Sequence, residues 1–247
     1  MTIPPTFPGR LELCDGAKEV AETASRELAA ALIRGLSERG RVALGLSGGN
    51  TPRSAYALLA KAPGILWRDV DVFWVDERAV PQNDDRSNFR HANEMLINPA
   101  EIPHEHVHRM KGEMRDLEAA ARSYEREIAE VVPTDGAGLP AFDVLVLGVG
   151  DDGHTASLFP GEPAVSVTER VVLAIPAKGE REARLTLSAP VIKAAKRIFV
   201  LATGASKKGP LAKAWDGKGD PVATPIRIVR NAFGEVVWVV DRAAAGR

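Results

Sequence analysis

The sequence has little cysteine, no surplus of charge of either sign and no long apolar run. Of its 247 residues only Cys14 is a cysteine, so no disulfide can form within the chain. Such a composition fits a reducing cytosol, and we expect Cys14 to be a small apolar filler at the end of the first strand. The low cysteine content therefore favours a cytoplasmic protein.

The charge balance limits the partners that the protein can have. Lysine and arginine total 32 and aspartate and glutamate total 33, which gives a formal net charge of −1. Binding to nucleic acid or to an anionic membrane surface requires a basic surplus, so we expect neither partner. No apolar run is long enough to span a bilayer. Prolines in the N-terminal MTIPPTFPGR stand where a signal peptide needs its apolar core.

Short apolar strands alternate with amphipathic helices along the chain. Strands over 10–14 and 42–46 flank a helix over 16–39, in which apolar residues recur at every fourth position. Further strands are predicted over 70–75, 142–147, 171–175, 197–202 and 236–240. Strands that alternate with helices are typical of α/β proteins. We therefore predict a mostly parallel, Rossmann-like open sheet with helices on both faces.

One stretch, FDVLVLGVGDDGHTASLFPG from Phe142 to Gly161, organises the chain. Its apolar opening suits a strand that is buried on both faces of a parallel sheet. Asp152 and His154 follow in the glycine-rich turn. Ligands of open α/β sheets bind beyond the carboxyl ends of strands, so these two side chains are candidates for proton chemistry on a small substrate. Taken alone, His154 would more often be an ordinary histidine of a capped loop.

Gly148, Gly150 and Gly153 also spell G-x-G-x-x-G, the pattern of dinucleotide-binding loops. That pattern needs a full helix after the loop to receive the pyrophosphate. Pro160 leaves too little room for such a helix. The two aspartates of the loop would repel a pyrophosphate, and no strand that ends in an acidic residue follows at the expected interval. We therefore expect no dinucleotide cofactor.

A second loop, SGGNT over 47–51, has the character of a phosphate-binding turn. Its glycines allow a tight turn, Thr51 is a good N-cap, and Pro52 suits the first position of a helix that we expect to reach about Lys61. Free N–H groups at a helix start bind anions, and the hydroxyls of Ser47 and Thr51 add donors. An ordinary strand–helix turn would look the same, but a polar loop without acidic residues favours phosphate.

Two other strand ends carry charge where ligands bind. Asp76, Glu77 and Arg78 follow the strand over 70–75, although a solvated strand end would look the same. Lys207 follows a glycine turn at a helix start, where the helix dipole disfavours a cation. A phosphate partner would explain this lysine, and so would a surface position with the ammonium group in solvent.

Three alternating histidines, His104, His106 and His108, would share one face of a strand and are conceivable metal ligands. Few supporting ligands surround them, and they lie in a proline-bounded connector. We therefore expect solvent-facing histidines and no metal site.

The segment 176–182 is polar and contains glycine, so we expect an exposed or mobile loop there. The stretch RLTLS over 184–188 follows it and leads into a short helix that starts near Ala189. Whether the loop closes over a ligand is open at this point.

Five motifs of the chain occur in the order and spacing seen in the 6-phosphogluconolactonases, which share a superfamily with glucosamine-6-phosphate deaminase. They are LGLSGGNTP, VDERAVPQNDDRSNF, LGVGDDGHTASLFPG, RLTLSAP and ATGASKK, and the resemblance covers about residues 10–240. It implies a single-domain α/β enzyme over 1–247, without metal or cofactor, that hydrolyses 6-phosphogluconolactone in the pentose phosphate pathway. Lone α/β domains of this size are often monomers, so we expect a monomer.

Two positions resemble the lactonases more than the deaminase. The deaminase loop continues into Phe-Asn-Glu-Pro, and its glutamate supports the histidine during sugar-ring opening, whereas this chain has Phe159 there. The deaminase also has tyrosine after Asp-Glu, where this chain has Arg78. A deaminase/isomerase and a non-catalytic sugar-phosphate sensor are the alternative functions. The intact Asp-Gly-His sequence and the lack of an attached DNA-binding region disfavour the sensor.

Residue chemistry and the resemblance together suggest roles for the candidate site residues. His154 is expected to be the general base that activates water, and Asp152 to orient its ring. The resemblance implies that Arg78 lies near the histidine and the substrate, where it serves either the carbonyl or the phosphate. Gly-x-x-Lys is the family spacing, which favours Lys207 over Lys208. The expected phosphate- and sugar-binding residues are Ser47, Gly48, Gly49, Asn50, Thr51, Asp76, Arg184 and Lys207.

Overall fold

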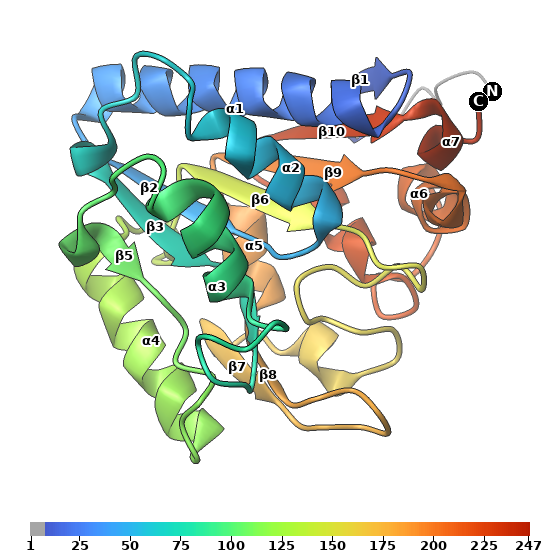
Figure 1. Cartoon of the computed structure of the whole chain (residues 1–247). Coiled ribbons are helices and arrows are strands. Elements are labelled where there is room, and N and C mark those ends of the chain that lie inside the picture. The colour runs from blue at the N-terminus through green and yellow to red at the C-terminus, as the bar shows by residue number, and fades with distance from the viewer. Residues whose placement is uncertain (1–7) are drawn as a thin grey trace.

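The computed structural model describes residues 8–247 (Figure 1). Most of the N-terminal segment on which the signal-peptide argument rests lies outside the described residues. A seven-stranded sheet forms the centre of the fold, and all its strand pairs are parallel. In spatial order its strands are β1 (Arg10–Cys14), β10 (Glu235–Asp241), β9 (Arg197–Ala202), β6 (Val144–Gly148), β2 (Val42–Leu46), β3 (Val70–Trp74) and β5 (Val107–His108).

Helices lie on both sides of this sheet. Figure 1 shows α1 and α2 together on one face, with α4 and α5 on the other side. The helices are α1 (Ala17–Arg39), α2 (Asn50–Leu59), α3 (Asn88–Ala92), α4 (Leu117–Val131), α5 (Ala189–Ala194), α6 (Lys208–Trp215) and α7 (Arg242–Ala245). The predicted parallel open sheet with helices on both faces is confirmed. Among the described residues, no helix combines the length and the apolar character that crossing a bilayer requires.

Burial explains the sequence pattern of the central strands. Every residue of β2 and β3 is buried, as is β6 up to Leu147, because helices or loops cover both faces of these strands. In α1, Val20, Ala24 and Leu28 are completely buried, as expected for a helix with one apolar face. The core of the protein therefore lies between the centre of the sheet and its covering helices.

A second, three-stranded sheet was not predicted. It consists of β4 (Asp76–Arg78), β8 (Arg184–Leu187) and β7 (Val172–Ile175) and is antiparallel. The chain changes sheets at Val75, whose N–H donates to Leu46 in the main sheet while its carbonyl accepts from the N–H of Leu187. The strand predicted over 70–75 therefore ends at Trp74, and β4 is too short to be recognised from its sequence.

Two helix predictions differ from the structure in detail. α2 begins at Asn50, with Gly49 rather than Thr51 as its N-cap, because Gly49 makes the turn with a φ of 104° that favours glycine. The sequence also predicts a helix from Asn88 to Leu96 with Ser87 as its N-cap. The structure has α3 with that N-cap, followed by a π-helical turn, Asn93–Ile97. Within residues 8–247, five short 3₁₀ segments also connect the elements: Trp67–Asp69, His104–His106, Pro163–Ser166, Ala205–Lys207 and Pro225–Asn231.

The alternating histidines do not share one strand face. His104–His106 form a 3₁₀ turn, and only Val107–His108 pair with the sheet as β5. Within residues 8–247, no three His, Cys, Asp or Glu side chains are grouped so that they could hold a metal ion. Two of the histidines instead contact Asp71, so the expectation that all three face solvent is wrong.

Asp71 joins three strands at the amino ends of the sheet. Its buried carboxylate lies 2.8 Å from Nη2 of Arg41, 3.0 Å from Nδ1 of His106 and 3.3 Å from Nε2 of His108. Burial alone would raise the pKa of Asp71, but the hydrogen bonds from the two histidines and the arginine outweigh it and lower the pKa to about 2. The ionised carboxylate therefore holds the edge strand β5 onto β3.

We expect Asp71→Asn to lower the free energy of unfolding at pH 7 by about 2 kcal/mol. The reason is that the variant loses the ionised carboxylate whose hydrogen bonds lower the pKa of Asp71. The contribution of Asp71 is complete above the pKa of the unfolded chain, about 3.9, and is lost as the pH falls through about 2. Urea unfolding between pH 7 and pH 2 measures it. Asp69→Asn, which removes a partly exposed pair with Arg68, is the control. Equal losses in the two variants would contradict this account.

Candidate active site

One cavity of about 420 Å³ lies at the carboxyl ends of the central strands. It is bounded by the segments that follow β2, β6 and β9 and by β4 and β8 of the small sheet. All the predicted site residues except Asp152 line it: Ser47, Gly48, Gly49, Asn50, Thr51, Asp76, Arg78, His154, Arg184 and Lys207. The structure thus brings together residues that are far apart in the sequence.

Sheet topology explains why the cavity is here. From β2 the chain proceeds to β3 and β5 on one side, whereas from β6 it proceeds to β9 and β10 on the other. Loops that leave two neighbouring parallel strands in opposite directions leave a crevice between them. The loop after β2 and the loop after β6 form the two walls of that crevice.

Asp152 lies beside His154 and holds Nδ1 of its ring. Its Oδ1 is 2.7 Å from Nδ1 of His154 and also accepts the backbone N–H of His154 at 2.9 Å. The hydrogen bond from the imidazole lowers the pKa of Asp152 to about 2 despite partial burial, so the carboxylate is ionised at neutral pH. An ionised acceptor assigns the ring proton to Nδ1 and leaves Nε2 as the basic nitrogen.

The glycines of this loop make room for the imidazole. A Cβ on Gly150 would lie 2.0 Å from Nδ1 of His154, so only glycine fits there. Gly153 has a φ of 90°, and the N–H of Gly150 donates to the carbonyl of His154 at 2.8 Å. No α-helix occurs between β6 and the 3₁₀ turn at Pro163–Ser166. The G-x-G-x-x-G pattern therefore shapes a tight turn around a histidine.

The loop after β2 is held from both sides. The hydroxyl of Tyr56 donates to the carbonyl of Ser47 and accepts its N–H, at 3.0 and 3.1 Å. A Cβ on Gly48 would lie 1.8 Å from Oδ1 of Asn88, so glycine is required where the two segments meet. The hydroxyl of Ser47 is buried and has no partner within the described part of the chain. This loop presents the N-terminus of α2 and a free hydroxyl to the cavity.

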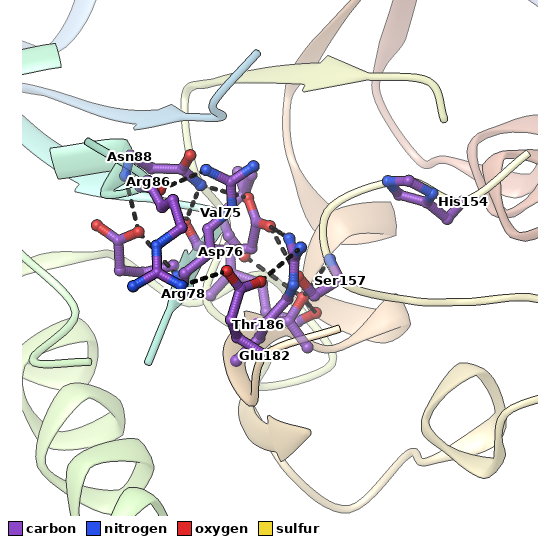
Figure 2. Close-up of polar contacts among 12 residues, drawn as sticks. Val75, Asp76, Arg78, Arg86, Asn88, His154, Ser157, Glu182 and Thr186 are labelled. Carbon is purple, nitrogen blue, oxygen red and sulfur yellow. Dashed lines mark hydrogen bonds and ion pairs between the residues drawn. The ribbon is translucent and has the colours of Figure 1, made fainter. Parts of the chain in front are cut away.

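A buried polar cluster forms the opposite wall (Figure 2). Asp76 accepts from the hydroxyl of Ser157 at 2.7 Å and from Nδ2 of Asn88 at 3.2 Å, and it lies 3.9 Å from Nη1 of Arg184. Burial lowers the pKa of Arg184, and the charge of Asp76 opposes that shift. Arg78 donates to the carbonyl of Arg86 at 2.5 Å. The arrangement keeps two arginines beside the cavity.

Lys207 has a partner that the sequence did not indicate. Its Nζ lies 2.5 Å from Oδ1 of Asp151, which also accepts from the hydroxyl of Ser206 at 2.9 Å. These contacts, led by the one from Lys207, lower the pKa of Asp151. The ion pair links the loop after β6 to the segment after β9. A second contact joins the segment after β9 to α2: Oγ1 of Thr203 lies 2.8 Å from Oγ1 of Thr51.

The sequence did not identify Asn88 and Thr203 as site residues, and it suggested the wrong place for Glu77. Asn88 and Thr203 line the cavity, and the buried Glu77 accepts the hydroxyl of Ser87 and the N–H groups of Arg78, Asn88 and Phe89. The pattern S-N at the start of a predicted helix was the only signal for Asn88. Glu77 was grouped with the ligand-facing charges, whereas the structure turns it away from the cavity to hold the start of α3.

Comparison with known proteins identifies the family. The family model described as glucosamine-6-phosphate isomerases/6-phosphogluconolactonase matches residues 15–238. A 6-phosphogluconolactonase of Synechocystis is 37% identical over 213 residues, which cover 86% of this chain and 87% of the relative. One of Streptomyces coelicolor is 35% identical over 237 residues, covering 92% and 90%.

Solved structures agree with this result. The structure of 6-phosphogluconolactonase from Trypanosoma brucei superposes with a TM-score of 0.87 at 28% identity and covers 97% of this chain and 98% of its own. The family match, the sequence relatives and this structure all extend over nearly the whole chain. The chain belongs to the glucosamine-6-phosphate isomerase/6-phosphogluconolactonase family.

Proposed function

We propose that this protein hydrolyses 6-phospho-D-glucono-1,5-lactone to 6-phospho-D-gluconate, the lactonase step of the oxidative pentose phosphate pathway. The observation that carries the proposal is the cavity in which an Asp152-oriented His154 lies across from a phosphate-type loop. The relatives from Synechocystis and Streptomyces coelicolor are named 6-phosphogluconolactonase and support the choice of substrate. The protein is then a carboxylic ester hydrolase.

His154 is the general base in this proposal. Its Nε2 removes a proton from water as the water oxygen bonds to C1 of the lactone and the carbonyl electron pair moves onto its oxygen. When the carbonyl re-forms, the bond from C1 to the ring oxygen breaks, and the ring oxygen takes up a proton, from the imidazolium or from water, to become a hydroxyl. Asp152 keeps Nε2 basic by holding the proton on Nδ1, and its charge stabilises the imidazolium that forms. General bases of this kind typically accelerate reactions by about 10²- to 10⁴-fold.

The phosphate is bound by the loop after β2. The N-terminus of α2 offers N–H groups near Gly48 and Gly49, and the hydroxyls of Ser47 and Thr51 lie in the same cavity wall. Lys207 supplies a positive charge to this wall. Because the 6-phosphate and C1 are at opposite ends of the substrate, holding the phosphate places C1 for attack.

Other charges of the cavity suit an anionic sugar. Arg78 and Arg184 supply positive charge, and Asp76 fixes Arg184 and the amide of Asn88. Asn50 lies at the first turn of α2, where it can contact the sugar hydroxyls. Together these side chains would hold the substrate and stabilise the negative charge that develops on the carbonyl oxygen.

We also propose that the protein acts as a monomer in the cytoplasm. Lone α/β domains of this size are often monomers, and one chain supplies the histidine, the loop after β2 and the cations that the proposed reaction uses. Cys14 is buried and unpaired, which suits a reducing compartment.

Wild-type protein should strongly accelerate the hydrolysis of freshly prepared 6-phosphoglucono-1,5-lactone beyond its spontaneous rate. His154→Ala should lose about 10²- to 10⁴-fold in kcat, because water then lacks its base. The assay follows lactone loss with the enzyme-free rate subtracted. His104→Ala, at an exposed histidine outside the cavity, is the matched control. No acceleration by folded wild type would refute the lactonase, whereas an active His154→Ala would refute only the mechanism.

Asp152→Asn should lower kcat on the order of a hundredfold, since the imidazolium loses its counter-charge. Asp152 stays ionised at neutral pH, since its pKa is about 2. Asp151→Asn is the control and should keep most of kcat, because Asp151 contacts Lys207 and not His154. Steady-state kinetics at neutral pH compare the two variants. Equal losses of kcat in both would contradict the role assigned to Asp152.

Lys207→Met should raise KM by about tenfold to a hundredfold with a smaller change in kcat, as expected for the loss of a charged hydrogen bond to phosphate. Lys208→Met is the control, because Lys208 is exposed and does not line the cavity. Steady-state kinetics separate the two constants. A rise in KM in the Lys208 variant alone would show that the wrong lysine was chosen.

A further inference from the structure

The ring of Phe159 contacts both His154 and Arg181. Its centroid lies 4.8 Å from that of the imidazole, with the two planes tilted by 43°. The guanidinium carbon of Arg181 lies 3.8 Å from the Phe159 centroid, which is the distance of a close stack. Phe159 is only 7% exposed, and neither it nor Arg181 lines the cavity. Both therefore lie behind the face that meets a substrate.

Arg181 is held in place by the turn between β7 and β8. The N–H of Lys178 donates to the carbonyl of Arg181 at 3.0 Å, and the N–H of Arg181 donates back at 3.1 Å. Gly179 has a φ of 59°, which a tight turn of this kind needs. The side chains at the tip, 176–180, are exposed as predicted, whereas Arg181 and Glu182 are partly buried.

Ion pairs join this turn to its surroundings on two sides. Glu162, at the end of the loop that carries His154, lies 2.8 Å from Nζ of Lys178 and 3.4 Å from Nη2 of Arg181. Glu182 lies 2.9 Å from Nη1 of Arg86, in the segment that precedes α3 (Figure 2). The turn is thus fastened to the loop that carries His154 and to the segment before α3. Arg181 is its contact with Phe159.

The hydrogen bond between Nδ1 and Asp152 limits the rotation of the His154 ring about its Cβ–Cγ bond. Because a hydrogen bond tolerates bending by tens of degrees, it leaves the plane of the imidazole only loosely set. The tilted contact with Phe159 restricts this rotation. Phe159 can do so only if its own ring is held, and the stacked guanidinium covers one of its faces.

We infer that Arg181 is a positioning residue that acts on His154 through Phe159. The inference rests on the proposed role of His154 as general base. Arg181 sets the plane of the imidazole, and with it the direction of Nε2, while taking no part in binding substrate. The turn between β7 and β8 therefore contributes to turnover through packing behind the cavity.

Arg181→Met should lower kcat by about threefold to thirtyfold with KM nearly unchanged, the range that corresponds to the loss of one cation–π stack. Lys178→Met is the matched control: it lies in the same turn and also pairs with Glu162, but it has no contact with Phe159 among the described residues. Thermal midpoints of both variants show whether folding is affected. A raised KM at unchanged kcat would make Arg181 a substrate-binding residue, and unchanged kinetics would remove its role; each result overturns the inference.

A double-mutant cycle tests the route through Phe159. In Phe159→Leu, adding Arg181→Met should have almost no further effect on kcat, because the ring that transmits the contact is gone. Losses of kcat that add in the double variant would overturn this route. So would side-chain NMR signals of His154 that are the same in Arg181→Met as in wild type. The NMR comparison requires no turnover. It therefore tests the position of the ring even if the lactone is not the substrate.

Discussion

The parallel arrangement of β2, β6 and β9 is the constraint on which the rest of the structure depends. Three neighbouring parallel strands bring their carboxyl ends to one edge, and the chain leaves β2 and β6 in opposite directions. The loop after β2 then faces the loop after β6, and the segment after β9 supplies Lys207 beside them. A phosphate-type turn and a histidine–aspartate pair can therefore share one cavity, although about 100 residues separate them in the chain.

The small antiparallel sheet completes this cavity and stiffens it. Its strands β4 and β8 carry Arg78 and Arg184, and Thr186 of β8 accepts the N–H of Ser157, whose hydroxyl donates to Asp76. Through Ser157 the loop that carries His154 is tied to β4 and β8, and Phe159 ties it to the turn between β7 and β8. The segment 150–162 thus carries the proposed general base, His154. Through Ser157 and Asp76 it also contacts the wall of the cavity that holds Arg184.

Local sequence signals located most of this architecture, and contacts between distant segments account for what was missed. Apolar runs closed by glycine identified β2 and β6, and the spacing of four residues identified α1, because each signal depends on burial of a single element. The pairing of Asp151 with Lys207 and the contact of Asn88 with Gly48 depend on how separate loops meet. The switch of sheet at Val75 likewise depends on partners in β2 and β8, which the sequence near Val75 does not encode.

A crystal structure with bound 6-phosphogluconate is the most direct test of the central claim, that one ligand spans the two loops. The phosphate should lie at the N-terminus of α2, next to Gly48, Gly49 and Lys207. The C1 carboxylate should lie within hydrogen-bond reach of His154, at about 3 Å from Nε2. A ligand bound in the reverse direction, with its phosphate at His154 and C1 at Gly49, would contradict the account.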